Sequence, residues 1–270
     1  MKINEDRCVG CGNCLPYCTM GAIRIENRMA VVNEDECVEC NTCYRCCVPE
    51  GRRPMLVRTV RRWLHRFRLQ YNAPMGICPT GALVPPDLEW PRLIRRAFSD
   101  PTVSHGETKL AGRGTEEIKT NDITGRIGPG HAGVVIDLGR PGTGCFLSDI
   151  EIMTRALATL KIEFESNNPL TGIMENPKTG AFRRDVLGEK VLSAIIEFKV
   201  PLGQLPGVLE MVKKTAGELN TVISVGVSSR CEDDGTMPHE KACQDAGFLA
   251  SLNGKTNLGL GRPLFMGDSK

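Results

Sequence analysis

The stretch from Cys8 to Cys18 reads C-V-G-C-G-N-C-L-P-Y-C and places cysteines at positions 8, 11, 14 and 18. Three thiolates separated by two residues each, with a fourth after three more, let one loop surround a cubane of iron and sulfide. Zinc sites usually take their cysteines in pairs rather than in triples. The spacing therefore predicts an iron–sulfur cluster and disfavours zinc.

A second run, C-V-E-C-N-T-C at 37–43, repeats the first half of this pattern with Cys37, Cys40 and Cys43. Its fourth ligand is identified by internal repetition, because T-M-G-A-I after Cys18 matches P-T-G-A-L after Cys78. We therefore predict Cys78, which follows an insertion. Cys47 remains the alternative, because it has the expected spacing from Cys43.

Residues 1–86 resemble the bacterial-type ferredoxins with two [4Fe–4S] clusters, a family of small electron carriers, on the strength of these two runs. In that family the fourth cysteine of a run binds the other cluster. The resemblance implies one cluster on Cys8, Cys11, Cys14 and Cys78, and another on Cys37, Cys40, Cys43 and Cys18. The sequence departs from the family at Thr19, where proline is usual, and by splitting its second repeat. The first departure affects hydrogen bonding at one cluster, and the second bears on the choice between Cys78 and Cys47.

The insertion, residues 45–77, holds eight arginines against one glutamate, whereas residues 1–44 hold four basic and seven acidic residues. Leu56, Val60, Trp63 or Leu64, and Phe67 recur at helical spacing, which predicts a basic amphipathic helix. Three interpretations are open. The helix is a lid whose apolar stripe covers a cluster while its arginines are solvated, or it docks an acidic redox partner, or it meets a nucleic acid or a membrane surface.

The chain of 270 residues is long enough for two domains. Ten of its thirteen cysteines precede residue 79, which favours metal binding over a disulfide framework. We find neither a signal-peptide pattern nor an apolar run long enough to span a membrane. These features predict a cytoplasmic protein in a reducing, oxygen-poor setting, with no nucleic-acid partner.

The rest of the chain predicts an α+β protein in four segments. A ferredoxin domain at 1–86 is followed by an extended linker or arm at 87–132, with a short helix expected in W-P-R-L-I-R-R-A-F and Pro91 in its first turn. Residues 133–230 predict the order β-α-β-β-α-β, a split βαβ sandwich, and residues 231–270 a tail that wraps over a surface. Ser148 and Glu151 form a capping-box pattern at the first helix of this sandwich.

Several weaker candidates lie in the second half. Gly139-Arg-Pro-Gly-Thr-Gly144 is typical of a tight turn, and in its strand-to-helix setting it is also a candidate anion site through Arg140. A metal site at Cys231, His239 and Cys243 has weak spacing. Cys145 at a helix start is a candidate for a lowered pKa, but a cysteine in this position is more often a small apolar filler. Cys46 and Cys47 are expected to be spare thiols. A polar cluster is formed by Arg113, Lys119, Asn121, Asp122 and Arg126.

Three functions follow from these patterns. The first is an electron-transfer subunit that delivers low-potential electrons within a larger oxidoreductase complex. The second is a reductase with a substrate or flavin site at residues 113–144. The third is a redox or small-ligand sensor. The sequence specifies no catalytic residue.

Overall fold

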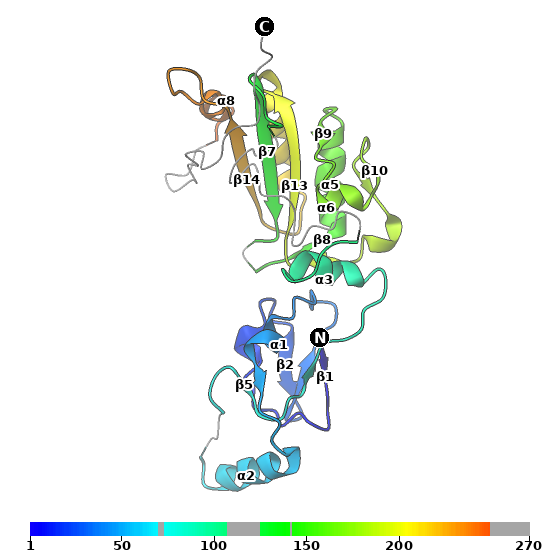
Figure 1. Cartoon of the computed structure of the whole chain (residues 1–270), viewed down its shortest axis with the longest axis vertical. Helices are drawn as coiled ribbons and strands as arrows, with labels where there is room; N and C mark the ends of the chain where they lie inside the picture. The colour runs from blue at the N-terminus through cyan, green and yellow to red at the C-terminus, as the bar shows by residue number, and fades with distance from the viewer. Residues whose placement is uncertain (70–72, 107–124, 141, 249–270) are drawn as a thin grey trace.

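The computed structural model of the chain describes residues 1–69, 73–106, 125–140 and 142–248. The molecule is elongated, with the cysteine-rich part at one end and a larger sheet-and-helix part at the other (Figure 1). Helix α3, Leu93–Ser99, lies between the two parts. Helices and strands are both present, so the expectation of an α+β protein is confirmed.

The cysteine-rich part is built on short antiparallel pairs. Strand β1 (Lys2–Ile3) pairs with β6 (Leu83–Val84), and β2 (Ile23–Glu26) pairs with β3 (Met29–Val32). Asn27 and Arg28, which join β2 to β3, both have positive φ, at 47° and 63°. Two such residues form the tight turn that suits the twist of a two-residue hairpin. A 3₁₀ turn, Leu15–Tyr17, and helix α1, Thr42–Cys46, follow the two cysteine runs.

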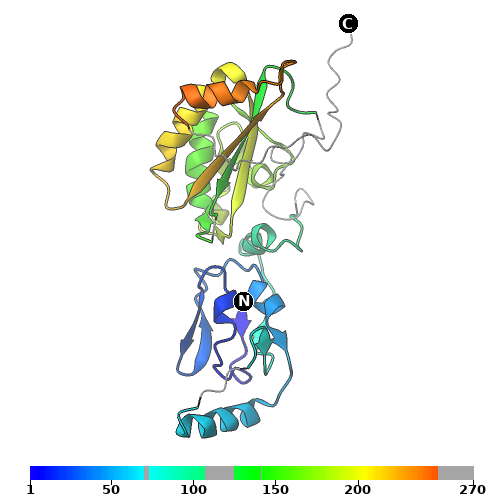
Figure 2. The ribbon, with the colours of Figure 1, turned by 90° about the vertical axis from the view of Figure 1, so that its left-hand side faces the viewer.

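The insertion leaves and re-enters this part through one pair of strands. Strand β4 (Val48–Pro49) runs parallel to β5 (Ile77–Cys78), and between them lies helix α2, Pro54–Arg66. The predicted helix is therefore present. It lies at the end of the molecule that is furthest from the large sheet (Figures 1 and 2).

Helix α3 confirms the short helix that was expected after residue 86, although Pro91 lies before it instead of in its first turn. Its residues Ile94 and Phe98 are buried in the core of the second part. Arg92 and Arg95, from the same helix, bind main-chain groups of the first part. Residues 107–124 of the expected linker lie outside the described residues.

The second part contains a four-stranded sheet in the order β14-β7-β13-β9, with every neighbouring pair antiparallel. Its strands are β7 (His131–Leu138), β9 (Glu163–Phe164), β13 (Ala194–Pro201) and β14 (Ile223–Ser229). Helices α5 (Leu147–Ala158) and α7 (Leu205–Ala216) lie on one face of this sheet (Figure 2). The shorter elements are β8 (Cys145–Phe146), α6 (Pro169–Gly172), β10 (Met174–Asn176), β11 (Ala181–Phe182), a 3₁₀ turn at Arg184–Val186, β12 (Lys190–Val191), a 3₁₀ turn at Leu202–Gln204, and α8 (Pro238–Asp245).

The hydrophobic pattern explains this packing. In α5, Leu147, Ile150 and Leu157 recur at helical spacing and are fully buried. In β7 the side chains of both faces are buried from Ala132 to Leu138, so the strand is covered on both sides. Each fully buried aliphatic side chain contributes roughly 1.5–3 kcal/mol of transfer free energy.

One expectation for this part was wrong. The Ser148–Glu151 capping box does not form, because α5 begins at Leu147 after Phe146 and the Glu151 carboxylate accepts from the Phe182 amide at 3.0 Å. Within the expected tail, residues 238–245 form helix α8, and residues 249–270 lie outside the described residues. Ala242 and Cys243 of α8 pack against the core of the sheet.

Candidate iron–sulfur centre

Four of the predicted ligands surround one cavity. Cys8, Cys11, Cys14 and Cys78 line it together with apolar residues such as Ile3, Ala30 and Leu83. The first three come from the loop after β1, and Cys78 comes from β5 at the end of the insertion. The structure therefore brings Cys78 next to three thiols of the first run, from which it is far apart in the sequence.

Main-chain amides are directed at three of the cysteine sulfurs. The Ala30 amide donates to Cys8 Sγ at 3.2 Å, the Ala22 amide to Cys18 Sγ at 3.1 Å, and the Ala82 amide to Cys78 Sγ at 3.2 Å. The last two bonds occupy matching places in the internal repeat, four residues after each cysteine. Amide donation to sulfur stabilises a thiolate and tunes a cluster that it binds.

This repetition bears on the choice between Cys78 and Cys47. Cys47 is also buried near the first cavity, where burial, together with the neighbouring thiols of Cys78 and Cys11, raises the pKa of its own thiol to about 11. Its Sγ faces the carbonyl oxygen of Asn13 at 3.5 Å, so it is placed as a thiol donor. Cys78 lines the cavity, and its Sγ accepts a hydrogen bond from the Ala82 amide. This arrangement fits the predicted ligand better than that of Cys47 does.

The second group consists of Cys18, Cys37, Cys40 and Cys43. Burial and, after it, the neighbouring thiols of Cys40, Cys18 and Cys37 raise the pKa of the Cys43 thiol to about 12. These four cysteines are thus close enough to influence one another. The Thr19 hydroxyl lies 3.6 Å from Cys40 Sγ, so the residue that replaces the family's proline adds a hydrogen bond at this group.

The crowding of thiols suits a polynuclear cluster. Burial, and then the neighbours Cys11 and Cys47, raise the pKa of Cys14 to about 12, so these thiols ionise only next to a strong positive charge such as iron. No three His, Cys, Asp or Glu side chains of the described residues converge closely enough to hold one metal ion. A cubane places each ligand on a different iron, which keeps the sulfurs further apart than around a single ion.

One buried hydroxyl supports the fit of a cluster in the first cavity. Thr80 is only 4 % exposed and lines this cavity, yet its Oγ1 has no hydrogen-bond partner among the described residues. An unsatisfied buried hydroxyl costs about 1–3 kcal/mol. A cluster sulfur in the cavity would accept from this group. The residues present therefore fit the group that the spacing predicts.

The loop around the first cavity depends on Gly10. Its φ is +63°, and a Cβ built on it would lie 2.1 Å from the carbonyl oxygen of Arg28. Only glycine allows the loop to pass this close to the β2–β3 turn. The close approach also places Ala30, two residues after Arg28, where its amide reaches Cys8.

Helix α2 is fixed to the first loop by its arginines. The Arg58 guanidinium donates to the carbonyl oxygens of Glu5, Asp6 and Cys8, each at 2.9 Å. Arg61 donates to that of Gly10 at 3.3 Å. The lid interpretation is therefore wrong: arginines face the cluster loop, while most of the apolar stripe is exposed.

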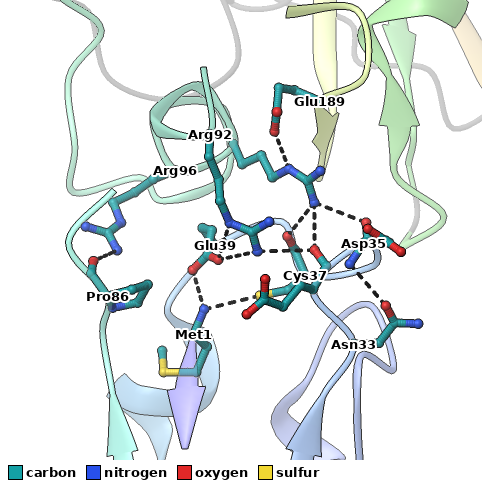
Figure 3. A network of polar contacts seen from close by, with 11 residues as sticks. Met1, Asn33, Asp35, Cys37, Glu39, Pro86, Arg92, Arg96 and Glu189 are labelled. Atoms are coloured by element: carbon teal, nitrogen blue, oxygen red, sulfur yellow. Dashed lines mark hydrogen bonds and ion pairs between the residues drawn. The ribbon is translucent and has the colours of Figure 1, made fainter. Parts of the chain in front are cut away.

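The second cysteine run is bound by helix α3 (Figure 3). Arg95, which is only 5 % exposed, donates to the carbonyl oxygens of Glu34, Asp35 and Cys37 at 2.9, 3.1 and 3.1 Å and forms an ion pair with Glu189.

Arg92 binds the buried Glu39 carboxylate, which also pairs with the Met1 amino group. Burial opposes ionisation of Glu39, but these two cationic partners outweigh it and lower its pKa.

Asp100, at the end of α3, binds the other side of this run. Its carboxylate accepts from Asn41 at 2.9 Å and pairs with Arg45 at 2.7 Å. The Arg45 guanidinium also donates to the carbonyl oxygen of Cys40 at 2.8 Å. The loop that carries Cys37, Cys40 and Cys43 is therefore held at both ends by one helix.

The described residues of the glycine-rich loop, 139–140 and 142–144, belong to a turn in which the amide of Gly144 donates to the carbonyl oxygen of Gly139 at 3.0 Å. Gly144 lies against the Met20 side chain, and Gly142 lies against the main chain of Thr19. Close by, Lys190 pairs with Glu36 at 2.6 Å. The loop thus packs on the turn that follows Cys18, a contact without any local sequence signal.

The remaining candidates do not form a site among the described residues. Arg126 pairs with the buried carboxylates of Glu165 and Glu197, and the other members of its predicted cluster lie outside the described residues. Burial raises the pKa of Cys145 to about 12, which fits a small apolar filler and not a thiol of lowered pKa. His239 is bonded to the Ser229 hydroxyl at 2.8 Å instead of to a group of cysteines. Cys46 is exposed.

Residues 1–24 match the family model of the 4Fe-4S binding domain, Fer4. No curated protein and no solved structure matches the chain. The match supports an iron–sulfur electron-transfer role and a ferredoxin-type segment that binds a [4Fe–4S] cluster. Among the described residues, every helix is too short or too polar to cross a membrane.

Proposed function

We propose that this chain is a two-cluster ferredoxin-type electron carrier, with Cys8, Cys11, Cys14 and Cys78 holding one [4Fe–4S] cluster and Cys37, Cys40, Cys43 and Cys18 holding the other. The observation that carries the proposal is the paired arrangement of Cys18 and Cys78. Each belongs to a different group of four thiols, and each accepts from an amide four residues later. That is the arrangement expected when each run lends its last cysteine to the other cluster.

Bound clusters would supply reversible one-electron chemistry. The chain's own residues hold and tune them: amides of Ala22, Ala30 and Ala82 donate to sulfurs. The Thr19 hydroxyl, 3.6 Å from Cys40 Sγ, would donate to a cluster-bound thiolate of the second group. Such donors stabilise the reduced, more negative state.

We also propose that the carrier is a dedicated subunit of a larger oxidoreductase complex, working at low potential in a reducing cytoplasm. The support is its size. Beyond a ferredoxin domain at 1–86 the chain carries an arm at 87–132, a domain at 133–230 and a tail at 231–270, which a diffusing carrier does not need. The order β14-β7-β13-β9, with two helices on one face, supports a split βαβ sandwich for the domain.

Iron and sulfide analysis of anaerobically purified protein tests the two-cluster assignment. We expect about eight iron atoms per chain and a brown protein whose absorbance bleaches on reduction. A value near four would contradict the assignment. Spin coupling between the reduced clusters, seen by electron paramagnetic resonance, would support their proximity.

A second candidate is a reductase with a ligand site in the second part. It is favoured by one observation, the contact of the 139–144 loop with the turn after Cys18. Flavin absorbance in the purified chain, or reduction of a small-molecule acceptor by the chain alone, would favour it over a carrier.

A further inference from the structure

The exposed face of α2 is apolar. Met55, Leu56, Trp63 and Phe67 are 81, 62, 60 and 58 % exposed, and Val60, between them, is 40 % exposed. Leu56, Val60, Trp63 and Phe67 recur every three or four residues and form one stripe along the helix. Trp63 and Phe67 are in edge-to-face contact, with ring centroids 5.1 Å apart. We call these five residues the α2 stripe.

The stripe is fixed in its orientation. Val57, on another face, is buried, and Arg58 is bonded to three carbonyl oxygens of the loop that leads to Cys8. Rotation of α2 to bury the stripe would break these three hydrogen bonds.

The surroundings of the stripe are strongly cationic. Residues 51–86 contain seven arginines and no Asp or Glu. Arg62, Arg66 and Arg68 are exposed in or just after the helix. An apolar helical stripe rich in Trp, Phe and Leu with arginines beside it is the pattern of a helix that lies in the interface of an anionic bilayer. The arginines would bind headgroup phosphates while the stripe enters the acyl region.

We propose that α2 is an interfacial anchor that binds the chain to anionic lipid surfaces. Charge complementarity favours this occupant, and so does the position of the helix. It lies across the end of the elongated molecule, where a flat surface can contact its length (Figures 1 and 2). Its 13 residues extend about 20 Å, which suits a helix lying on a bilayer and is too short to span one. Nucleic acid would match the arginines and leave the five apolar side chains exposed to water.

Anchoring through α2 would place the first cavity next to the membrane surface. Arg58 bonds directly to the carbonyl oxygen of Cys8, so the lipid-facing helix and the first cysteine group form one unit. The proposal does not depend on the electron-transfer function, because lipid binding can be measured whatever the chain's redox role.

The test uses the full chain with the clusters loaded and the substitution Trp90→Phe, which leaves Trp63 as the one tryptophan. The protein is sedimented with phosphatidylcholine vesicles, with and without phosphatidylglycerol. We expect binding to the anionic vesicles, a shift of Trp63 emission to shorter wavelength, and weaker binding at high salt. No binding to anionic vesicles, with unchanged emission, overturns the proposal and would leave a protein as the occupant of the stripe.

Matched variants separate the apolar and the charged contributions. Trp63→Ser with Phe67→Ser should weaken binding about tenfold or more, and Arg62→Gln with Arg66→Gln should weaken it for anionic vesicles. The controls are Val222→Ser and Lys178→Gln, which change exposed side chains of the second part. Cluster absorbance and circular dichroism show that each variant is folded. Binding that survives the double serine variant, or falls equally in the controls, overturns the proposal.

Discussion

The guanidinium of Arg95 donates to the carbonyl oxygen of Cys37 at 3.1 Å while it pairs with Glu189 of the second part. One buried side chain therefore connects the loop of a cysteine ligand to the sheet-bearing half of the molecule. Movement of either half changes the environment of the second cysteine group. The two halves are coupled by this helix residue rather than by the chain connection alone.

Replacing Arg95 with alanine should destabilise the protein by about 2–4 kcal/mol, because three carbonyl oxygens and the Glu189 carboxylate lose a buried partner. The measurement is anaerobic urea unfolding followed by cluster absorbance. Arg24→Ala is the control, since its ion pair with Glu26 is exposed and should contribute less than about 1 kcal/mol. Equal effects of the two substitutions would refute the coupling role of Arg95.

The choice of fourth ligand is tested by two serine variants. Cys78→Ser should reduce the iron content from about eight to about four atoms per chain, because the first cluster loses a thiolate. Cys47→Ser should retain both clusters, because its thiol faces the carbonyl oxygen of Asn13. The reverse result would identify Cys47 as the ligand.

The unpaired hydroxyl of Thr80 should tune the first cluster. Thr80→Val removes a donor of nearly the same size, so the reduction potential of one cluster should fall by roughly 20–60 mV, the equivalent of about 0.5–1.5 kcal/mol for one electron. Protein-film voltammetry measures both potentials. Thr80→Ser should restore the value, and a shift in both clusters or in neither would count against a local hydrogen bond.

Removal of iron should unfold the first part and leave the second intact. In the smaller core, four of the nine buried residues are cysteines, namely Cys8, Cys43, Cys47 and Cys78, so few apolar groups remain without a metal. Trypsin should then cut readily at the arginines of 52–68, while the β7–β13 region stays protected. Limited proteolysis with mass spectrometry measures this, and equal protection of both parts in the iron-free protein would disprove it.

The cysteine groups and most elements follow from local pattern. The hairpin, α2, α3 and the strands and helices of the second part each have a readable period or turn. The ligand assignment itself rests on the repeat around Cys18 and Cys78 and stays a prediction.

The contacts of single residues could not be derived in this way. Amphipathic spacing does not show which face of α2 turns inward. An inward face can be apolar and fill a core, or it can carry an arginine such as Arg58 that binds carbonyl groups. Arg95 lies in a short basic helix that carries no motif, and Glu151 bonds across space to Phe182. The role of Thr80 can be inferred only from the structure, in which its hydroxyl lines the cavity without a hydrogen-bond partner among the described residues.

The parallel pairing of β4 with β5 means that the α2 excursion begins and ends at neighbouring points of the chain. The two ends of this segment are held together by hydrogen bonds: the Val48 amide donates to the carbonyl oxygen of Gly76, and the Glu50 amide donates to that of Cys78. A segment held in this way can change in length or composition while Cys78 keeps its position beside Cys8, Cys11 and Cys14. The surface that α2 binds and the cluster site that Cys78 completes can therefore change independently during evolution.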